Sequence, residues 1–214
     1  MWNLPPADSV LHLLSWLALA AQAMTAALAA GRRSMDWMGV CLLGAITSLG
    51  GGTLRDVLLG HYPLAWVERP SLLLLTVLAP FVTIAMARLV HRLTMAFLVL
   101  DAIGLVVFTI AGCDIAWQMN VPIGIVIVAG MITGCAGGVL RDILCNDVPL
   151  LFRAELYASV SLLTGLLYAG GLSLGLAGGI LTALSFAFGL AFRLLAIRYK
   201  WNMPRFVFTG EEQR

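Results

Sequence analysis

Charged residues are scarce in this chain. Only 11% of its 214 residues are Asp, Glu, Lys or Arg, and 61% are apolar. A soluble globular domain has about a quarter charged residues and is about half apolar. The composition therefore excludes an ordinary soluble domain and predicts an integral membrane protein. The alternating pattern of a membrane β-barrel is missing, whereas apolar runs of about 20 residues predict helices that span the bilayer.

The sequence also lacks the motifs of catalytic and cofactor-binding sites. Its four cysteines match no metal-ligand spacing, and its three histidines are scattered, so we expect no metal site. It has no G-x-S-x-G motif, and no glycine-rich phosphate loop is followed by Lys-Ser. We therefore expect neither an enzyme nor a bound cofactor. The net charge of +2 is too small to indicate nucleic acid as a partner.

Apolar runs divide the chain into seven segments separated by short polar or proline-containing connections. The predicted spans are 9–30, 37–60, 71–88, 94–117, 121–145, 155–172 and 175–197. We therefore predict an all-α integral membrane protein with seven transmembrane helices. The whole chain, 1–214, forms a single membrane domain that ends in a cytoplasmic tail at 198–214.

Basic residues gather in alternate connections between the predicted spans and in the tail. The connections on the other side of the membrane contain only Arg69, beside Glu68. Cytoplasmic loops of membrane proteins collect Lys and Arg. We therefore predict an amino terminus outside and a carboxy terminus inside. The basic residues that support this orientation are Arg32, Arg33, Arg88, Arg92, Arg153, Arg198, Lys200, Arg205 and Arg214.

A sequence motif occurs twice. Residues 44–64 read GAITSLGGGTLRDVLLGHYPL and residues 130–150 read GMITGCAGGVLRDILCNDVPL, with 11 identities in 21 positions at a shift of 86. The copies lie on the second and fifth spans, an odd number of spans apart, so they cross the membrane in opposite senses. This pattern predicts an inverted repeat, 9–88 against 94–172, with a seventh helix at 175–197 added. Inverted repeats with interrupted helices are typical of transport proteins.

Glycines open both copies of the motif: Gly50, Gly51 and Gly52 in the first, Gly137 and Gly138 in the second. Each glycine weakens a helix by up to about 1 kcal/mol relative to alanine. We therefore expect the second and fifth helices to kink or unwind locally here. Close helix packing through small residues explains the same glycines as well.

Charges follow the glycines in both copies, as Arg55 and Asp56 and as Arg141 and Asp142. A charged side chain at the bilayer centre costs about 2.5–3.5 kcal/mol on insertion scales, so it faces a wet cavity or a partner. Pore lining and mutual pairing both remain open. Three further polar residues share helix faces with the motif: Thr47, Ser48 and Thr133.

Polar residues outside the motif are fewer. Asp101 lies near the start of the fourth span, where it caps the helix or attracts cations to a wet vestibule. Asp114 lies near the other end of that span. Gln22, in the first span, either lines a polar path or makes a hydrogen bond between helices.

The two motifs, GGG-x-L-R-D-(x6)-P-L and GG-x-L-R-D-(x6)-P-L, together with DAIGLVVF at 101–108, resemble the bacterial homologues of the trimeric intracellular cation (TRIC) channels. These share a sequence family that is also labelled glycine transporter. The resemblance implies a homotrimer in the bacterial inner membrane with one pore in each subunit. It further implies kinked second and fifth helices around the pore and passive flow of K⁺ and Na⁺. Ala136 departs from the pattern, because it replaces the glycine found at position 50 of the first copy.

Three functions therefore remain open. The first is a monovalent cation channel. The second is a carrier for a small zwitterion such as glycine, because Arg-Asp pairs match a carboxylate and an ammonium group. The third is a structural or assembly protein in which the charges only pair with one another.

Overall fold

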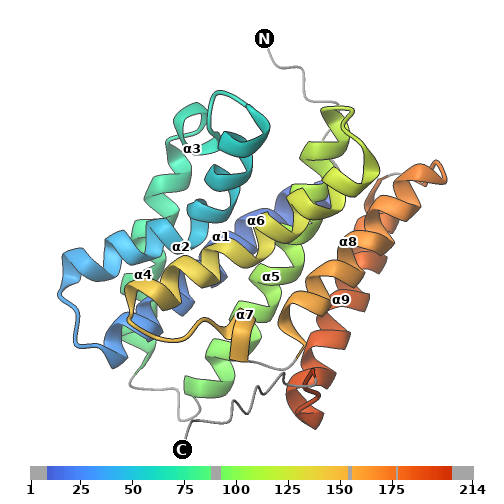
Figure 1. Cartoon of the computed structure of the whole chain (residues 1–214). Coiled ribbons are helices and arrows are strands. Elements are labelled where there is room, and N and C mark those ends of the chain that lie inside the picture. Colours follow the sequence, from blue (N-terminus) through green and yellow to red (C-terminus); the bar gives the residue numbers. More distant parts are fainter. Residues whose placement is uncertain (1–8, 88–92, 154–155, 177, 204–214) are drawn as a thin grey trace, which may run out of the picture.

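Helices make up nearly all of the structured chain (Figure 1). The structure is a computed structural model that describes residues 9–87, 93–153, 156–176 and 178–203, and within these residues it contains nine helices and no strand. They are α1 (Ser9–Arg32), α2 (Trp37–Leu59), α3 (Ala65–Glu68), α4 (Ser71–Ala87), α5 (Leu93–Gln118), α6 (Ile123–Leu144), α7 (Leu150–Arg153), α8 (Tyr157–Ser173) and α9 (Gly179–Tyr199). The predicted all-α membrane architecture is thus confirmed.

Five helices are long and apolar enough to cross a membrane: α1, α2, α5, α6 and α9. Helices α4 and α8 have 17 residues each, and α3 and α7 are single turns. The seven longest helices correspond to the seven predicted segments, with ends that differ by a few residues. Position 88, position 155 and the tail from 204 onward lie outside the described residues.

Local chemistry explains where α2 begins and ends. The Asp36 carboxylate accepts a hydrogen bond from the Gly39 amide at 2.7 Å and so caps the first turn. Gly60 ends the helix in the left-handed conformation at φ 68°, which costs a glycine little. Both signals are visible in the sequence, and the observed helix is one residue shorter than the predicted span.

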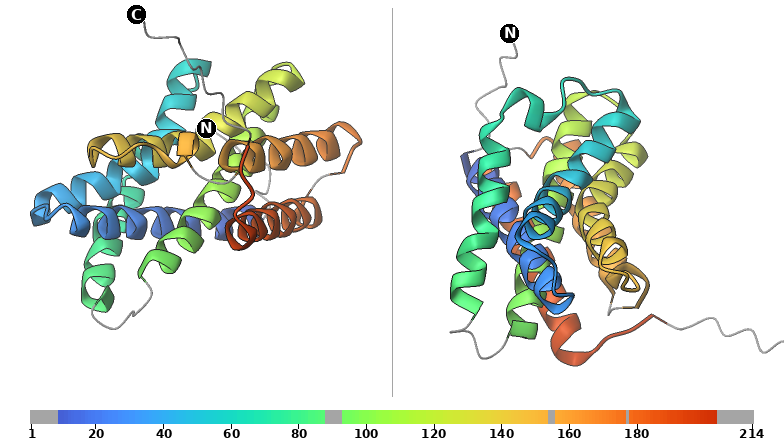
Figure 2. Two further views of the ribbon diagram at one scale, coloured as in Figure 1. Left: turned by 60° about the horizontal axis from the view of Figure 1, so that its bottom comes forward. Right: turned by 90° about the vertical axis from the view of Figure 1, so that its left-hand side faces the viewer.

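The two halves of the chain have the same helix neighbours. Helix α1 packs against α2 and α4, just as α5 packs against α6 and α8. Contacts of α1 with α5 and of α2 with α6 join the halves, and α9 packs mainly on α8 and α5. The left view of Figure 2 shows α9 beside α8 at one edge of the bundle.

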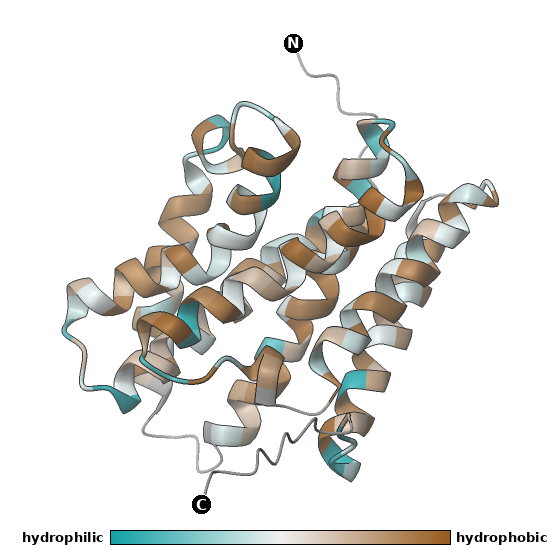
Figure 3. Cartoon of the chain, in the orientation of Figure 1, coloured by the Kyte–Doolittle hydropathy of each residue, from teal (hydrophilic) through white to brown (hydrophobic). Residues whose placement is uncertain are grey.

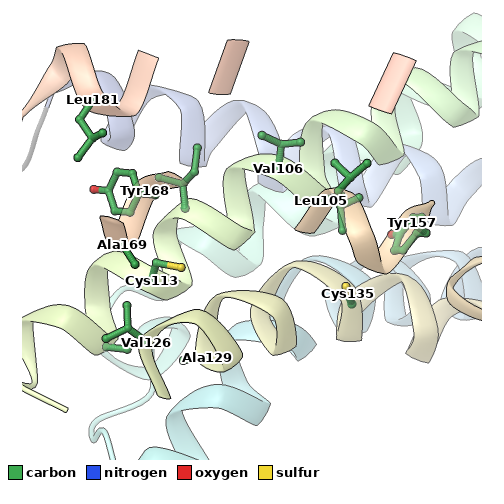
Figure 4. Packing of buried hydrophobic residues seen from close by; sticks show 13 residues of the cluster. Leu105, Val106, Cys113, Val126, Ala129, Cys135, Tyr157, Tyr168, Ala169 and Leu181 are labelled. Atoms are coloured by element: carbon green, nitrogen blue, oxygen red, sulfur yellow. The ribbon is translucent and has the colours of Figure 1, made fainter. Parts of the chain in front are cut away.

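Apolar side chains cover the outside of the bundle as well as its core. Figure 3 shows that apolar residues occur along the whole length of the long helices. Leu74 and Leu78 of α4, for example, are 66% and 60% exposed. The core cluster around Leu105 and Tyr168 joins α5, α6, α8 and α9 (Figure 4). Apolar faces on both sides fit a lipid environment.

Glycines allow α2 and α6 to touch backbone to backbone. A Cβ atom added to Gly51 would lie 2.3 Å from the Thr133 carbonyl oxygen, and one added to Gly137 would lie 2.3 Å from the Thr47 carbonyl oxygen. These contacts are equivalent under the 86-residue repeat, and they show that the helices run in opposite directions where they cross. Close packing therefore requires glycine at both positions.

Both motif helices keep their helical hydrogen bonding through the glycines. The α-helix is continuous at Gly50–Gly52 in α2 and at Gly137–Gly138 in α6. The local unwinding considered from the sequence is therefore not observed. Glycine's low helix propensity costs little here, because the close approach of the partner helix compensates for it.

Replacing Gly51 or Gly137 with alanine is expected to destabilise the fold by about 1–3 kcal/mol, the usual cost of overpacking. The added methyl group would meet a backbone carbonyl, which cannot move aside as a flexible side chain can. Thermal unfolding of the purified protein in detergent measures the loss.

Gly52→Ala is the matched control, because the nearest atom to its added methyl group is Arg55 Nη2 at 3.9 Å. The control should be neutral or slightly stabilising, because alanine favours helix. Equal losses at Gly51 and Gly52 would contradict the backbone contact.

Candidate functional site

The first charged cluster lies on α2, one turn beyond Gly51. Arg55 donates to Asp56 Oδ1 through Nε at 3.0 Å and through Nη2 at 2.6 Å, and its Nη1 lies 3.5 Å from Thr133 Oγ1 of α6. His61 Nδ1 lies 3.1 Å from the same Asp56 oxygen. Arg55 and Asp56 are only 3% and 1% exposed. The ion pair is therefore formed within one helix and covered by the next.

The second cluster lies on α6, one turn beyond Gly137. Arg141 donates to Asp142 Oδ1 through Nε at 2.9 Å and to Asp101 Oδ1 of α5 through Nη1 at 2.7 Å. The same Nη1 donates to Thr25 Oγ1 of α1 at 3.0 Å. The guanidinium also lies over the Phe97 ring, 4.6 Å from its centroid. Arg141 thus connects three helices, and both it and Asp101 are fully buried.

The clusters lie on opposite sides of the helix crossing. Four residues separate Gly51 from Arg55 and Gly137 from Arg141, which corresponds to about 6 Å along a helix. Because α2 and α6 run in opposite directions, each arginine lies toward a different end of the bundle. The two copies of the motif therefore meet at the Gly51 and Gly137 contacts.

The secondary polar candidates take different roles. Ser48 donates to the Leu19 carbonyl of α1 at 3.1 Å, and Thr133 donates to the Ala129 carbonyl of its own helix at 2.7 Å. The Thr47 hydroxyl is buried with no partner among the described residues. Gln22 is 1% exposed, and its side chain fills the space beside Gly104 of α5. Its position between α1 and α5 suits a helix contact.

Asp101 does not cap a helix. Helix α5 begins at Leu93, so Asp101 lies more than two turns inside it. The proposed capping role is therefore wrong. Its carboxylate instead binds the buried guanidinium of Arg141, which the sequence alone did not link to it. Asp142 Oδ2 accepts a hydrogen bond from the Leu150 amide at 2.9 Å, so the second cluster also fixes the connection after α6.

Two buried residues of this region were missed in the sequence. Arg193 of α9 is fully buried, and its guanidinium lies 4.9 Å from the centroid of the Tyr157 ring of α8. The Tyr157 hydroxyl lies beside Gly138 of α6, where atoms of Asp101 and Arg141 also gather. A lone arginine in the apolar run 179–197 was a usable signal, because such residues rarely face lipid.

The site supports ionic and hydrogen-bonding chemistry. Within the described ranges no group of three His, Cys, Asp or Glu residues could hold a metal ion. The charged groups are instead arranged as arginine–carboxylate pairs, and Arg141 faces two carboxylates. Such groups interact with a permeating ion or a small zwitterion only when the pairs open or become hydrated.

These features define a polytopic helical membrane protein with paired buried charges in an internal repeat. The sequence model of the family described as "Glycine transporter" matches it twice, at residues 12–88 and 98–173. The chain belongs to this family, which is related to the TRIC channels, and it is a prokaryotic homologue of those channels. The two matched stretches coincide with the two halves of the fold.

Curated relatives and solved structures agree with this assignment. The UPF0126 inner membrane protein YadS of Escherichia coli is 35% identical over 199 residues, which cover 91% of this chain and 96% of the relative. A UPF0126 membrane protein of Vibrio cholerae is 35% identical and covers 94% of this chain and 84% of its own length.

Solved structures of TRIC channels share the fold. The orthologue from Rhodobacter sphaeroides superposes with a TM-score of 0.86 at 33% identity, covering 90% of this chain and 99% of that one. A prokaryotic TRIC channel crystallised in KCl superposes with a TM-score of 0.84 at 29% identity, covering 91% and 99%.

Asp101→Asn is expected to destabilise the protein by about 3–5 kcal/mol, because it breaks a buried ion pair and leaves Arg141 undercompensated. Thermal unfolding in detergent measures the change. Asp147→Asn is the control, since Asp147 pairs with Arg33 at the surface and such pairs contribute only about 0–1 kcal/mol. Losses of similar size for both variants would contradict the role of Asp101.

Proposed function

We propose that the chain is a channel for monovalent cations, K⁺ and Na⁺, with a pore in each subunit of a homotrimer. The observation that carries the proposal is the pair of buried charged clusters on α2 and α6, one turn to either side of the Gly51 and Gly137 contacts. The match to solved structures of TRIC cation channels supports it.

The charges argue for a polar path through the subunit. Lipid offers no hydrogen-bond partners, so ionised groups at membrane depth face protein or water. Two clusters on opposite sides of one crossing would form two polar constrictions in series. Arg141 pairs with two carboxylates, Asp101 and Asp142, whereas Arg55 pairs with Asp56.

Conduction requires the ion pairs to loosen. Arg55, Asp56, Arg141 and Asp101 are each at most 3% exposed, so the geometry corresponds to a closed state. An open state would bring water to these groups and let carboxylate oxygens replace part of the ion's hydration shell. Bending of α2 and α6 at the glycines would make room for this change, and the α2 ribbon in Figure 1 turns within its length.

We further propose that all seven long helices span the membrane. Helices α4 and α8, at 17 residues, reach the lower limit for a span. The basic end of the bundle, with Arg33 and Lys200, would face the cytoplasm. The amino terminus would then lie outside and the carboxy terminus inside.

A carrier for a small zwitterion is the second candidate, and the description of the matching family favours it. Glycine has a carboxylate for a guanidinium and an ammonium for a carboxylate, and both groups are present in each cluster. A carrier would show saturable uptake, whereas a channel would not.

Purified protein in liposomes is expected to release K⁺ rapidly when a proton carrier compensates the charge, and to show no saturable uptake of labelled glycine. Protein-free liposomes are the control. Saturable glycine uptake without K⁺ release would replace the channel with the carrier.

Arg141→Gln is expected to raise the permeability of K⁺ relative to Cl⁻, because two carboxylates lose their shared positive neighbour. Reversal potentials in planar bilayers measure the ratio, after gel filtration has confirmed an intact assembly. Arg198→Gln removes the same charge from an exposed position and serves as the control. Identical ratios for both variants would exclude Arg141 from the permeation path.

A further inference from the structure

A second polar region lies between α8 and α9, away from the crossing of α2 and α6. Thr164 of α8 and Thr182 and Ser185 of α9 are each 0% exposed. None of their hydroxyl groups has a hydrogen-bond partner among the residues that the structure describes. We call the interface that contains these three residues the α8–α9 seam.

The contacts of the two helices place the three hydroxyls in one stretch of this seam. A Cβ atom added to Gly189 would lie 2.5 Å from Thr164 Oγ1, so the Thr164 hydroxyl points at α9. A Cβ atom added to Gly171 would lie 2.4 Å from Leu181 Cδ1. Ser185 lies four residues and Thr182 seven residues before Gly189 on α9, so these three residues share one face of that helix.

Most buried hydroxyls of the described chain have a hydrogen-bond partner. A helical Ser or Thr usually donates to the carbonyl one turn earlier, as Thr83 does to Ala79 at 3.0 Å. Seven other buried hydroxyls have partners: Thr25, Ser48, Thr76, Thr83, Thr109, Thr133 and Ser161. The buried hydroxyls without a partner in the described ranges are the three of the seam, Thr47 and the phenol of Tyr157.

Polar side chains lead from the seam toward both ends of the bundle. At one end Tyr168 Oη donates to Asp114 Oδ1 of α5 at 3.0 Å, and Asp114 is partly exposed. At the other end Arg193 stacks on Tyr157. Figure 4 shows Tyr168 and Leu181 side by side at the seam. Polar groups therefore border the seam at both of its ends.

We propose that ordered water occupies the α8–α9 seam, bound by Thr164, Thr182 and Ser185, and that this buried hydration site fastens α9 to α8. Buried unpaired hydroxyls carry a desolvation penalty, and bulk water cannot reach them through lipid. A buried water molecule typically makes about three hydrogen bonds to such groups. Water bound here would connect α9, which lies outside the repeat, to the second half of the chain.

Hydroxyl-radical footprinting with mass spectrometry tests this site, because radicals form at bound water and label neighbouring side chains. Leu181 borders the seam, whereas Leu105 is buried in the same apolar cluster. We expect faster oxidation of Leu181 than of Leu105. The triple variant Thr164→Val, Thr182→Val, Ser185→Ala should reduce Leu181 oxidation to the rate of Leu105. Equal rates in the unmodified protein, or unchanged Leu181 oxidation in the triple variant, would overturn the proposal.

The direction in which the single variant Thr164→Val changes the melting temperature gives a second test. If water is bound, the variant removes one of its partners and lowers the melting temperature. If the seam is dry, the variant removes an unpaired buried hydroxyl and raises the melting temperature, which would overturn the proposal. Thr83→Val, whose hydroxyl bonds its own helix, controls for the loss of a hydroxyl as such. Neither measurement depends on ion flux. A negative result for the hydration site would therefore leave the proposed channel function untouched, and the reverse also holds.

Discussion

The contact between the backbones of α2 and α6 is the constraint on which the rest of the structure depends. Without side chains at Gly51 and Gly137, the helices approach until carbonyl oxygens occupy the space of the missing Cβ atoms. This approach brings Arg55 within reach of Thr133 on the other helix. Helices α1 and α5 then complete the surroundings of Arg141 through Thr25 and Asp101. Burial of the charges is thus a consequence of close helix packing.

Much of this arrangement could be predicted from the sequence, because its physical causes are local or periodic. Apolar runs predicted the long helices to within a few residues, and Asp36 and Gly60 mark the ends of α2 by ordinary capping. The repeated motif predicted that two glycine segments and two Arg-Asp pairs form equivalent structures. Equivalent contacts at Gly51 and Gly137 are the direct outcome of that repetition.

The remainder depends on how helices are rotated and paired, which a single sequence does not specify. Low helix propensity suggested that the glycines unwind, but tertiary contact keeps both helices continuous. Asp101 looked like a cap because it lies near a predicted span end, yet its partner is 40 residues away. Arg193 gave a signal of its own, but only packing shows that it meets Tyr157.

The two halves share a fold without sharing their chemistry. Arg55 reaches Thr133, and the repeat would place Thr47 as the equivalent partner of Arg141. Arg141 binds Asp101 and Thr25 instead, and the Thr47 hydroxyl has no partner in the described chain. Asp101 corresponds to Ser15 under the 86-residue shift. The first half therefore has no carboxylate at the equivalent position that could bind Arg55 in place of Thr133. One acidic residue therefore breaks the pseudo-symmetry, and the two arginines have different surroundings.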